Sequence, residues 1–473
     1  MALLEPAHHT ITEAAATVVF CFFATVLLFI SWQLFFHPLR VYPGPLLGRC
    51  TNLYAAYHAW KGDLHLDMYR CHEKYEIFSH GANVAKSDVY KAMVHSAPNT
   101  LTIRDKRDHG RRRRILSQAL SESQIRAYES IVLRHIRTLC SNIQAACDAN
   151  ETVDMSLQSD WFAFDVMSEV VFGMKFDALR KEEYRYVMKA LEQSNVRVSA
   201  LVQAACLAWG RLDRYLFPAS IRARNQFLGF IGRLLKARTM QDVPRATDVF
   251  SYLAGAKDPG GEASLNAAEI RAESATLVVA GSDTSSTTLA ATLFYLSSNP
   301  HAYDRVRQEV RSAFGSVDEI RIGPKLNSCS YLRGALWREV LPGGLAVGSV
   351  LLPEGVDVGV GIYSAHHNPE YFTSPFSYLP ERWLEADDAS TLESVERAKT
   401  AFYPFSLGPR SCVGKALAYH ELTLALAHIL YKFRFSRARE DAGSGNSAQE
   451  FVLKDHITGA KRALLLQFSF SGS

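Results

Sequence analysis

The stretch Phe405-Ser406-Leu407-Gly408-Pro409-Arg410-Ser411-Cys412-Val413-Gly414 decides how this sequence is interpreted. Its glycines and proline predict a loop, and the run from Lys415 to Arg434, with no further glycine or proline, predicts a helix that the loop opens. Backbone N–H groups and the helix dipole stabilise negative charge at such a position, so we expect the loop to favour the thiolate form of Cys412. The flanking glycines let a flat group approach the backbone, and Arg410 adds a permanent cation.

A cysteine in such a loop has four possible roles: part of a phosphate-binding loop, a nucleophile, a metal-bound thiolate or a plain buried side chain. The spacing from Gly408 to Gly414 is one residue longer than in a P-loop, which disfavours phosphate binding. A nucleophilic cysteine needs a base, and the loop offers no histidine. The residues alone leave the metal-bound thiolate and the buried cysteine open.

The composition is that of a globular protein. Of 473 residues, 48% are hydrophobic and 21% are charged, and the net charge of +4 argues against a dedicated nucleic-acid binder. The eight cysteines are scattered without a C-x-x-C pair, so we expect reduced thiols facing the cytosol and neither a structural zinc site nor a disulfide scaffold. The chain contains no G-x-S-x-G, which disfavours a membrane-bound hydrolase.

An apolar segment without a charged residue runs from Ala14 to Phe36 and is long enough to span a bilayer. A cleaved signal peptide is the alternative, but the residues before the segment carry no Lys or Arg. Positive charges after the segment place the body of the chain in the cytoplasm and residues 1–13 in the lumen. Prolines then predict a stiff hinge over residues 37–48, followed by one catalytic body over residues 49–473.

Helical periodicity dominates from Ala55 to Phe314, where apolar residues recur at three- and four-residue spacings. Asn266 and Glu269 form a helix start signal, and no breaker follows until Asn299-Pro300. These signals predict one long helix from Ala267 to Ser298.

Gly281, inside this long helix, is followed by Ser and Thr residues whose hydroxyls can bond to carbonyls one turn earlier. A kink or a close helix crossing is the plain explanation for such a segment. Further on, Val347 to Gly361 alternates Gly, Val and Leu and predicts a short sheet beside the helical body. Adjacent histidines such as His366 and His367 point to different faces, so we expect a loop or surface role for them and not a metal site.

These motifs resemble those of the cytochrome P-450 family, and they occur in the expected order over nearly the whole chain. F-x-x-G-x-R-x-C-x-G at residues 405–414 resembles the haem-binding signature at every fixed position. Ala280–Thr284 resembles the oxygen-binding motif of the long central helix, Tyr378–Trp383 the Pro-Glu-Arg segment, and Pro43–Pro45 the hinge after the membrane anchor. The sequence is similar to fungal microsomal members such as isotrichodermin hydroxylases and benzoate para-hydroxylases. The resemblance implies a mainly α fold with a small β region, preceded by one transmembrane helix.

The resemblance also implies a haem b cofactor, with Cys412 as the axial thiolate ligand of the iron and Phe405 shielding the thiolate. Asp283 and Thr284 are expected to organise the protons that leave with water, and Gly281 to give dioxygen and the macrocycle room. The haem-propionate partners implied by the resemblance are Arg410, Arg338, Arg113 and His109, and the glycines implied at the cofactor are Gly408 and Gly414. In the run from Arg111 to Arg114 we expect at least two side chains on a solvated helix face.

The implied function is a monooxygenase that inserts one oxygen atom from O2 into a lipophilic small molecule, such as a terpenoid or polyketide of fungal secondary metabolism. NADPH supplies the electrons through NADPH-cytochrome reductase, and cytochrome b5 is a further candidate partner. The implied location is the endoplasmic reticulum membrane, with a single span and a cytosolic catalytic domain.

The sequence departs from the family pattern at two places. Family members carry a helix with Glu and Arg three residues apart whose pair locks onto the residue matching Arg382, yet here Arg333 runs directly into Gly334 and the next segment. A pair of strands is also missing near Tyr75-Glu76. Our hypothesis is that these are omissions in the predicted coding sequence, or deletions that impair the enzyme and leave Arg382 without its partner. The alternative function is therefore a catalytically inactive relative that acts as a membrane-anchored binding protein.

Overall fold

The computed structural model describes residues 5–37, 40, 44–75, 90, 93–94, 97–240, 248–261, 263–336, 362–384, 391–438 and 450–471. Over these residues the chain forms the α-helices α1 (Glu5–Phe35), α2 (Leu46–Cys50), α3 (Leu53–Lys61), α4 (Leu64–Tyr75), α5 (Lys106–Ala119), α6 (Glu122–Ala149), α7 (Met155–Phe172), α8 (Tyr186–Gln203), α9 (Asp213–Leu216), α10 (Pro218–Met240), α11 (Val249–Gly255), α12 (Ala267–Ser298), α13 (Pro300–Ala313), α14 (Pro324–Asn327), α15 (Ser330–Leu336), α16 (Ile362–His366), α17 (Leu392–Ala401) and α18 (Lys415–Lys432).

The remaining regular elements are short. They are the 3-10 helices η3 (Ala205–Arg211), η4 (Val317–Glu319), η5 (Pro380–Trp383) and η6 (Gly408–Arg410), and the strands β1 (Thr152–Asp154), β2 (Phe433–Arg437), β3 (Leu453–His456), β4 (Thr458–Lys461) and β5 (Leu465–Phe470). The predicted mainly α fold with a small β region is confirmed. The sheet predicted over residues 347–361 lies outside the described residues.

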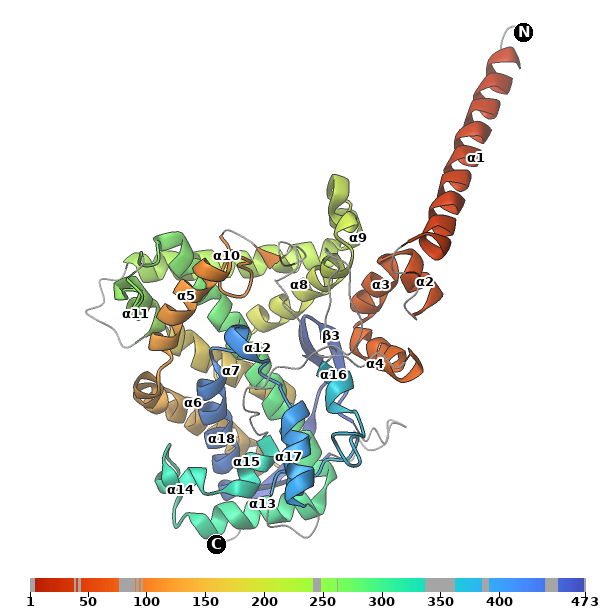
Figure 1. Cartoon of the computed structure of the whole chain (residues 1–473). Helices are drawn as coiled ribbons and strands as arrows, with labels where there is room; N and C mark the ends of the chain where they lie inside the picture. Colours follow the sequence, from red (N-terminus) through yellow and green to blue (C-terminus); the bar gives the residue numbers. More distant parts are fainter. Residues whose placement is uncertain are drawn as a thin grey trace.

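Helix α1 extends away from the helical body (Figure 1). Its segment Glu13–Phe35 has a mean hydropathy of 2.4 and is not buried by the rest of the chain. A helix of this length and composition is consistent with the predicted membrane anchor. The helix ends at Phe35 and α2 begins at Leu46, within the predicted hinge; residues 38–39 and 41–43 lie outside the described residues, and the hinge stays a prediction.

Helix α12 has the predicted bounds and crosses the centre of the body, where Figure 1 draws it in green beside α7. Asn266 accepts hydrogen bonds from the Ala268 and Glu269 amides at 3.0 Å each, and the Glu269 carboxylate accepts one from the Asn266 amide at 2.9 Å. This capping box satisfies N–H groups that a helix start otherwise leaves without partners. Asn299 and Pro300 end the helix, and α13 begins at the same proline.

The main apolar core joins α6, α7, α12 and α18. Strand β5 lies between β1 and β2 in an antiparallel sheet, with Leu466 opposite Val153 and Phe468 opposite Phe435. Strands β3 and β4 form a separate hairpin, in which β4 packs against α12. The hairpin therefore brings residues near the C-terminus to the middle of the central helix.

Gly281 marks a close crossing of α12 over α7. A Cβ atom at this position would lie 2.4 Å from Cε and 2.6 Å from Sδ of Met167, a buried residue of α7. The predicted hydrogen bond from a hydroxyl to a carbonyl one turn earlier is also present: Thr284 Oγ1 donates to the Ala280 carbonyl at 2.7 Å. Helix crossing accounts for this glycine, and its predicted role in giving dioxygen room stays a prediction.

A buried carboxyl group lies between α12 and α18. Ser285 Oγ donates to Glu421 Oε2 at 3.2 Å, and within the described part of the chain Glu421 Oε1 has no hydrogen-bond partner. Glu421 is only 1% exposed, and burial raises its pKa to about 8 despite the hydrogen bond from Ser285. The neutral carboxyl is therefore the favoured form at neutral pH.

Replacing Gly281 with Ala should destabilise the chain by about 1 to 3 kcal/mol, because the new methyl group overlaps Met167 in a packed interface. In a Met167→Ala background the same change should become neutral or stabilising, because alanine has the higher helix propensity. Denaturant unfolding of the full chain in detergent micelles, followed by circular dichroism, measures both effects. Equal losses in the two backgrounds would show that Met167 does not impose the glycine.

Glu421 should make the folded chain less stable as the pH rises. The unfolded carboxyl ionises near its ordinary pKa of 4.5, whereas the folded one keeps its proton up to about pH 8. Stability should therefore fall between these two values, by up to on the order of 5 kcal/mol. Glu421→Gln should remove this fall when unfolding free energies are measured across the window. An unchanged pH slope in the variant would show that Glu421 is ionised in the folded chain.

Candidate active site

The Cys412 loop folds as a closed turn at the start of α18. The Cys412 amide donates to the Phe405 carbonyl at 2.8 Å, and the Ser411 amide donates to the Gly408 carbonyl at 3.0 Å. Gly408 has a φ of +71°, a value that glycine adopts without strain, and no neighbouring atom restricts the space where its Cβ would be. Gly414 is the N-cap of α18, so the predicted loop that opens a helix is confirmed.

The Cys412 thiol is accessible, yet protein surrounds enough of it for desolvation to raise its pKa. This combination is typical of a side chain that borders an internal space. The Gly414 and Lys415 amides and the Arg113 charge lower the pKa, but by less than desolvation raises it. The expectation that the loop favours the thiolate is therefore wrong for the free side chain, and a cation bound to the sulfur is needed to reverse the balance.

Two of the predicted propionate partners are tied to this region of the backbone. Arg113, on α5, donates to the Ser411 carbonyl and, at 3.4 Å, to the Ser411 hydroxyl. Arg410 donates to the carbonyls of Ile103 at 2.7 Å and Arg104 at 3.1 Å. These bonds hold the cysteine loop against α5 and the segment before it, with both cations beside the loop.

The other predicted cofactor residues have different surroundings. His109 is 5% exposed on α5, and Arg338 lies outside the described residues. The Phe405 ring packs on Tyr419 of α18, with 5.3 Å between ring centroids. Its shielding of a thiolate, and every contact to a propionate, stays a prediction.

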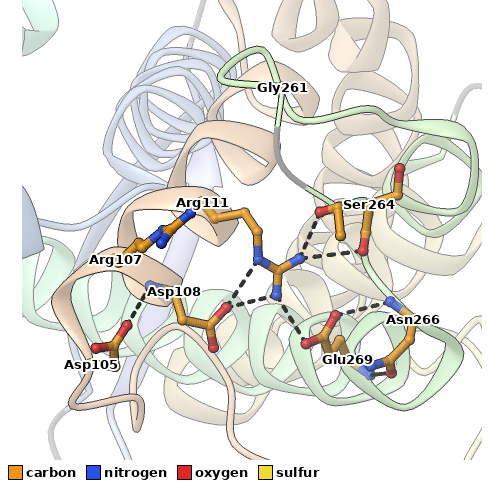
Figure 2. Close-up of a pocket in the computed structure, with 9 residues that line it drawn as sticks. Asp105, Arg107, Asp108, Arg111, Gly261, Ser264, Asn266 and Glu269 are labelled. Atoms are coloured by element: carbon orange, nitrogen blue, oxygen red, sulfur yellow. Dashed lines mark hydrogen bonds and ion pairs between the residues drawn. The ribbon is translucent and has the colours of Figure 1, made fainter.

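The arginine run on α5 does not form a solvated face. Arg111 is buried and donates to Asp108 at 2.7 Å, to Glu269 at 3.0 Å and to the Ser264 carbonyl at 3.3 Å, the arrangement drawn in Figure 2. Arg112 is also buried and donates to Glu269 at 2.8 Å. Arg113 is half-buried against the cysteine loop, and only Arg114 is exposed, so the expectation of at least two solvated side chains is wrong. Carboxylates at the start of α12 compensate for the burial of Arg111 and Arg112.

This ion-pair cluster borders an open pocket of about 700 Å³ between the N-terminal ends of α5 and α12 (Figure 2). The pocket residues hold one another in ion pairs and caps, so the cluster fixes α5 against α12. Arg113, on the same helix, is thereby positioned at the cysteine loop.

On α12, Asp283 and Thr284 point in different directions. Thr284 and Ala280, one turn apart, are exposed although their helix is central, whereas Asp283 is 8% exposed. Desolvation raises the Asp283 pKa, and a hydrogen bond from Thr458 and the charge of Lys461 oppose this rise. The exposed face of α12 therefore carries the threonine, and the buried face carries the acid.

The acid belongs to a polar cluster that the sequence did not reveal. Lys461 Nζ donates to Asp160 and, at 3.0 Å, to Ser286 Oγ, while Asn195 Nδ2 donates to Thr458 Oγ1 at 3.0 Å. These residues come from α7, α8, α12 and β4, so no local pattern links them.

His366 is not a surface residue. Its Nε2 accepts a hydrogen bond from the Tyr403 amide at 3.1 Å, and its ring lies 4.9 Å from the ring of Phe402. Burial, with the neighbouring charge of His367, lowers the His366 pKa to about 4, so the ring is neutral at neutral pH. The expected loop or surface role is therefore wrong for His366, which instead fixes the chain just before the cysteine loop.

The Pro-Glu-Arg segment is anchored by its neighbours. Glu381 accepts hydrogen bonds from Tyr331 on α15 and, at 3.5 Å, from Arg305 on α13. Arg382 donates to the carbonyls of Thr373, Ser374 and Ser377. Within the described residues no ion pair joins Arg382 to a carboxylate, and the hypothesis that it lost its partner stays a prediction.

A haem group fits this set of residues. Across the described part of the chain, His, Cys, Asp and Glu form no cluster of three that could hold a bare metal ion. Cys412 offers a single accessible thiol, so a metal here needs a cofactor that brings its own further ligands. The positive charges of Arg113 and Lys415 act on the thiol, which suits a macrocycle that carries carboxylate groups.

Comparison with known proteins gives a consistent result. Residues 73–456 match the model of the cytochrome P450 family. The chain is 45% identical to the cytochrome P450 monooxygenase poxM of Penicillium oxalicum over 96% of this chain and 94% of the relative. It is 54% identical to apf8 of Gibberella fujikuroi over 72% of this chain and 99% of the relative, and 43% identical to atnE of Emericella nidulans over 93% and 94%. Both of these relatives are also named cytochrome P450 monooxygenases.

The alignment with poxM extends over 495 positions, although this chain has 473 residues. Such an alignment contains gaps opposite this chain, so the relative carries internal residues that this chain lacks. The family model covers residues 73–456, and the alignment with poxM covers 96% of this chain, so this chain belongs to the cytochrome P450 family.

Proposed function

We propose that this chain is a haem-thiolate monooxygenase of the endoplasmic reticulum membrane that inserts one oxygen atom from O2 into a lipophilic small molecule. The proposed substrate class is a terpenoid or polyketide of fungal secondary metabolism. The observation that carries the proposal is the accessible Cys412 thiol at the start of α18, in a loop that Arg113 contacts from α5. The similarity to fungal monooxygenases supports the same activity.

Cys412 would hold the iron, and Arg113, Arg410 and His109 would hold the propionates. When bound, thiolate-ligated haem supplies the activation of dioxygen, with two electrons that originate from NADPH and arrive through a reductase. Cytochrome b5 is a second candidate donor. One oxygen atom enters the substrate, and the other leaves as water with two protons.

The chain's own residues provide the protons and fix the geometry. Thr284 presents a hydroxyl on the exposed face of α12, with its hydrogen donated to the Ala280 carbonyl. The hydroxyl oxygen can therefore accept a hydrogen bond while its own proton is held. Asp283, the adjacent buried acid, has a pKa raised by desolvation and can carry a proton at a pH where an exposed carboxyl would not.

The apolar helix α1 supports a membrane-bound form. The charges that follow it support a cytosolic body, according to the positive-inside rule. A single-span anchor would hold the body at the membrane surface, where lipophilic substrates partition.

A second candidate function follows from the gaps in the alignment with poxM. We place these gaps at Arg333-Gly334, inside α15, and at Tyr75-Glu76, where α4 ends. A natural chain with both deletions would be an inactive relative that keeps its anchor and body and acts as a binding protein. An omission in the predicted coding sequence would instead hide an active enzyme.

Microsomes that contain the chain should show a red-shifted Soret band in the carbon-monoxide difference spectrum after reduction. Cys412→Ala should abolish this band, because no other described side chain is placed to supply a thiolate. Ser411→Ala, a neighbouring change that keeps the Cys412 thiol, should retain it. Full-length protein without a band would reject the monooxygenase proposal for the chain as written.

Restoring the missing helix should raise the haem content. We expect that inserting the corresponding poxM segment between Arg333 and Gly334 increases the carbon-monoxide band per mole of protein at least about threefold, a gain of roughly 0.7 kcal/mol in haem affinity. Transcript reads across the two junctions, compared with this sequence, separate an omission from a natural deletion. Equal haem content with and without the insert would show that the helix is dispensable here.

A further inference from the structure

We propose that His366, at the end of α16, is a positioning residue for Cys412, because it holds the peptide group of Tyr403 from which the cysteine loop starts. This role rests on the proposed function, since it assigns the side chain that keeps the thiol where the haem iron would bind it. A continuous series of hydrogen bonds from α16 to the Cys412 amide carries it.

His366 is the last residue of α16, and it contacts the chain just after α17. Its Nε2 accepts a hydrogen bond from the Tyr403 amide at 3.1 Å, so the proton of the neutral ring lies on Nδ1. Burial lowers the pKa of the ring to about 4. The neutral form, which alone can accept this bond, is therefore present near neutral pH.

Packing alone does not set the direction of the Tyr403 peptide group. The preceding residue, Phe402, is part of a small apolar cluster separate from the main core, whose other buried members are Phe372, Trp383, Ala398 and Ala401. The Phe402 ring lies 4.6 Å from the Trp383 ring and 4.9 Å from the His366 ring. Apolar burial holds Phe402 in place without a preferred direction, whereas the hydrogen bond to His366 orients the peptide group that follows.

Tyr403 begins a four-residue turn that ends at Ser406. The Tyr403 carbonyl accepts a hydrogen bond from the Ser406 amide at 2.9 Å, and Pro404 lies at the second position of the turn, where its fixed φ is favoured. Ser406 has a φ of +59°, a left-handed value that is unfavourable for a residue with a side chain. A turn with such a residue persists only when its surroundings hold it.

The turn is held at two points. His366 holds its first residue, Tyr403. The third residue, Phe405, accepts a hydrogen bond from the Cys412 amide at 2.8 Å. His366 and Cys412 are thus joined through one turn, and loss of the histidine acceptor should release the loop at the end opposite to α18.

The neighbouring histidine offers a comparison within the same chain. His367 Nδ1 lies 2.8 Å from the Tyr363 carbonyl, and its Nε2 lies 3.6 Å from Glu450 Oε1. Its ring stacks on that of Tyr363, with 4.0 Å between centroids. These contacts lead away from the cysteine loop, so the two adjacent imidazoles can be tested separately.

The first test measures hydrogen exchange and does not depend on haem. His366→Phe keeps an aromatic ring beside Phe402 but removes the acceptor. The amides of Tyr403, Ser406 and Cys412 should then exchange about fivefold faster in the full chain in micelles, the effect of losing one net hydrogen bond. His366→Gln, whose side-chain oxygen can take the place of Nε2, should restore slow exchange. Mass spectrometry of the peptides that cover the loop gives the rates.

His367→Phe is the matched control, because it removes the adjacent imidazole and leaves the acceptor for Tyr403 in place. It should not change exchange in the loop. Phe372→Leu loosens the apolar cluster but keeps the acceptor, so it should raise loop exchange less than His366→Phe does. Unchanged loop exchange in His366→Phe, no restoration by His366→Gln, or an equal increase in Phe372→Leu would each overturn the proposal.

The second test uses microsomes and the carbon-monoxide difference spectrum. In His366→Phe the ratio of the red-shifted band to the unshifted band of haem without a thiolate ligand should fall about fivefold, because the same hydrogen bond is lost. His366→Gln and His367→Phe should keep the wild-type ratio. An unchanged ratio in His366→Phe would refute a role in holding the thiol. A wild-type chain without a red-shifted band rejects the monooxygenase function, and the exchange rates then still decide whether His366 holds the loop.

Discussion

The close approach of α12 to α7 at Gly281 is the constraint on which the site depends. Because a side chain here would overlap Met167, the glycine fixes how α12 is rotated about its axis. Successive helical residues are turned by about 100°, so this one contact directs Asp283 towards the hairpin and Ser285 towards Glu421 on α18. Thr284 is left on the exposed face. A single packing contact thus separates the buried acid from the accessible hydroxyl.

Around the cysteine loop, the arrangement of charges matters more than packing. The loop holds an accessible thiol whose pKa desolvation raises, with Arg113 and Arg410 fixed beside it through backbone carbonyls. The charges of Arg113 and Lys415 act on the thiol, which is neutral when nothing is bound to it. A thiolate-bound iron in a macrocycle with anionic carboxylates balances these charges. The charge pattern is therefore complementary to the whole cofactor, and no single residue accounts for it.

Local signals were sufficient for the elements but not for the polar clusters. The capping residues at Asn266 and the breaker at Asn299-Pro300 fixed both ends of α12, because caps act within one turn of the chain. The glycine pattern likewise placed Cys412 at a helix start. Burial of Arg111 and the position of Lys461 could not be predicted, because their carboxylate partners lie on other elements. A run of basic residues is interpreted as a solvent-exposed helix face unless carboxylate partners on other elements are known.

The start of α15 is held by contacts with α13 and with the Pro-Glu-Arg segment. The Glu309 carboxylate accepts hydrogen bonds from the Tyr331 and Leu332 amides at 2.9 and 2.7 Å, which fixes the start of α15 to α13. The Tyr331 side chain in turn reaches Glu381. Among the described residues, Arg382 donates hydrogen bonds only to backbone carbonyls and has no carboxylate partner. These contacts join α13, α15 and the Pro-Glu-Arg segment into one packed unit within the described residues.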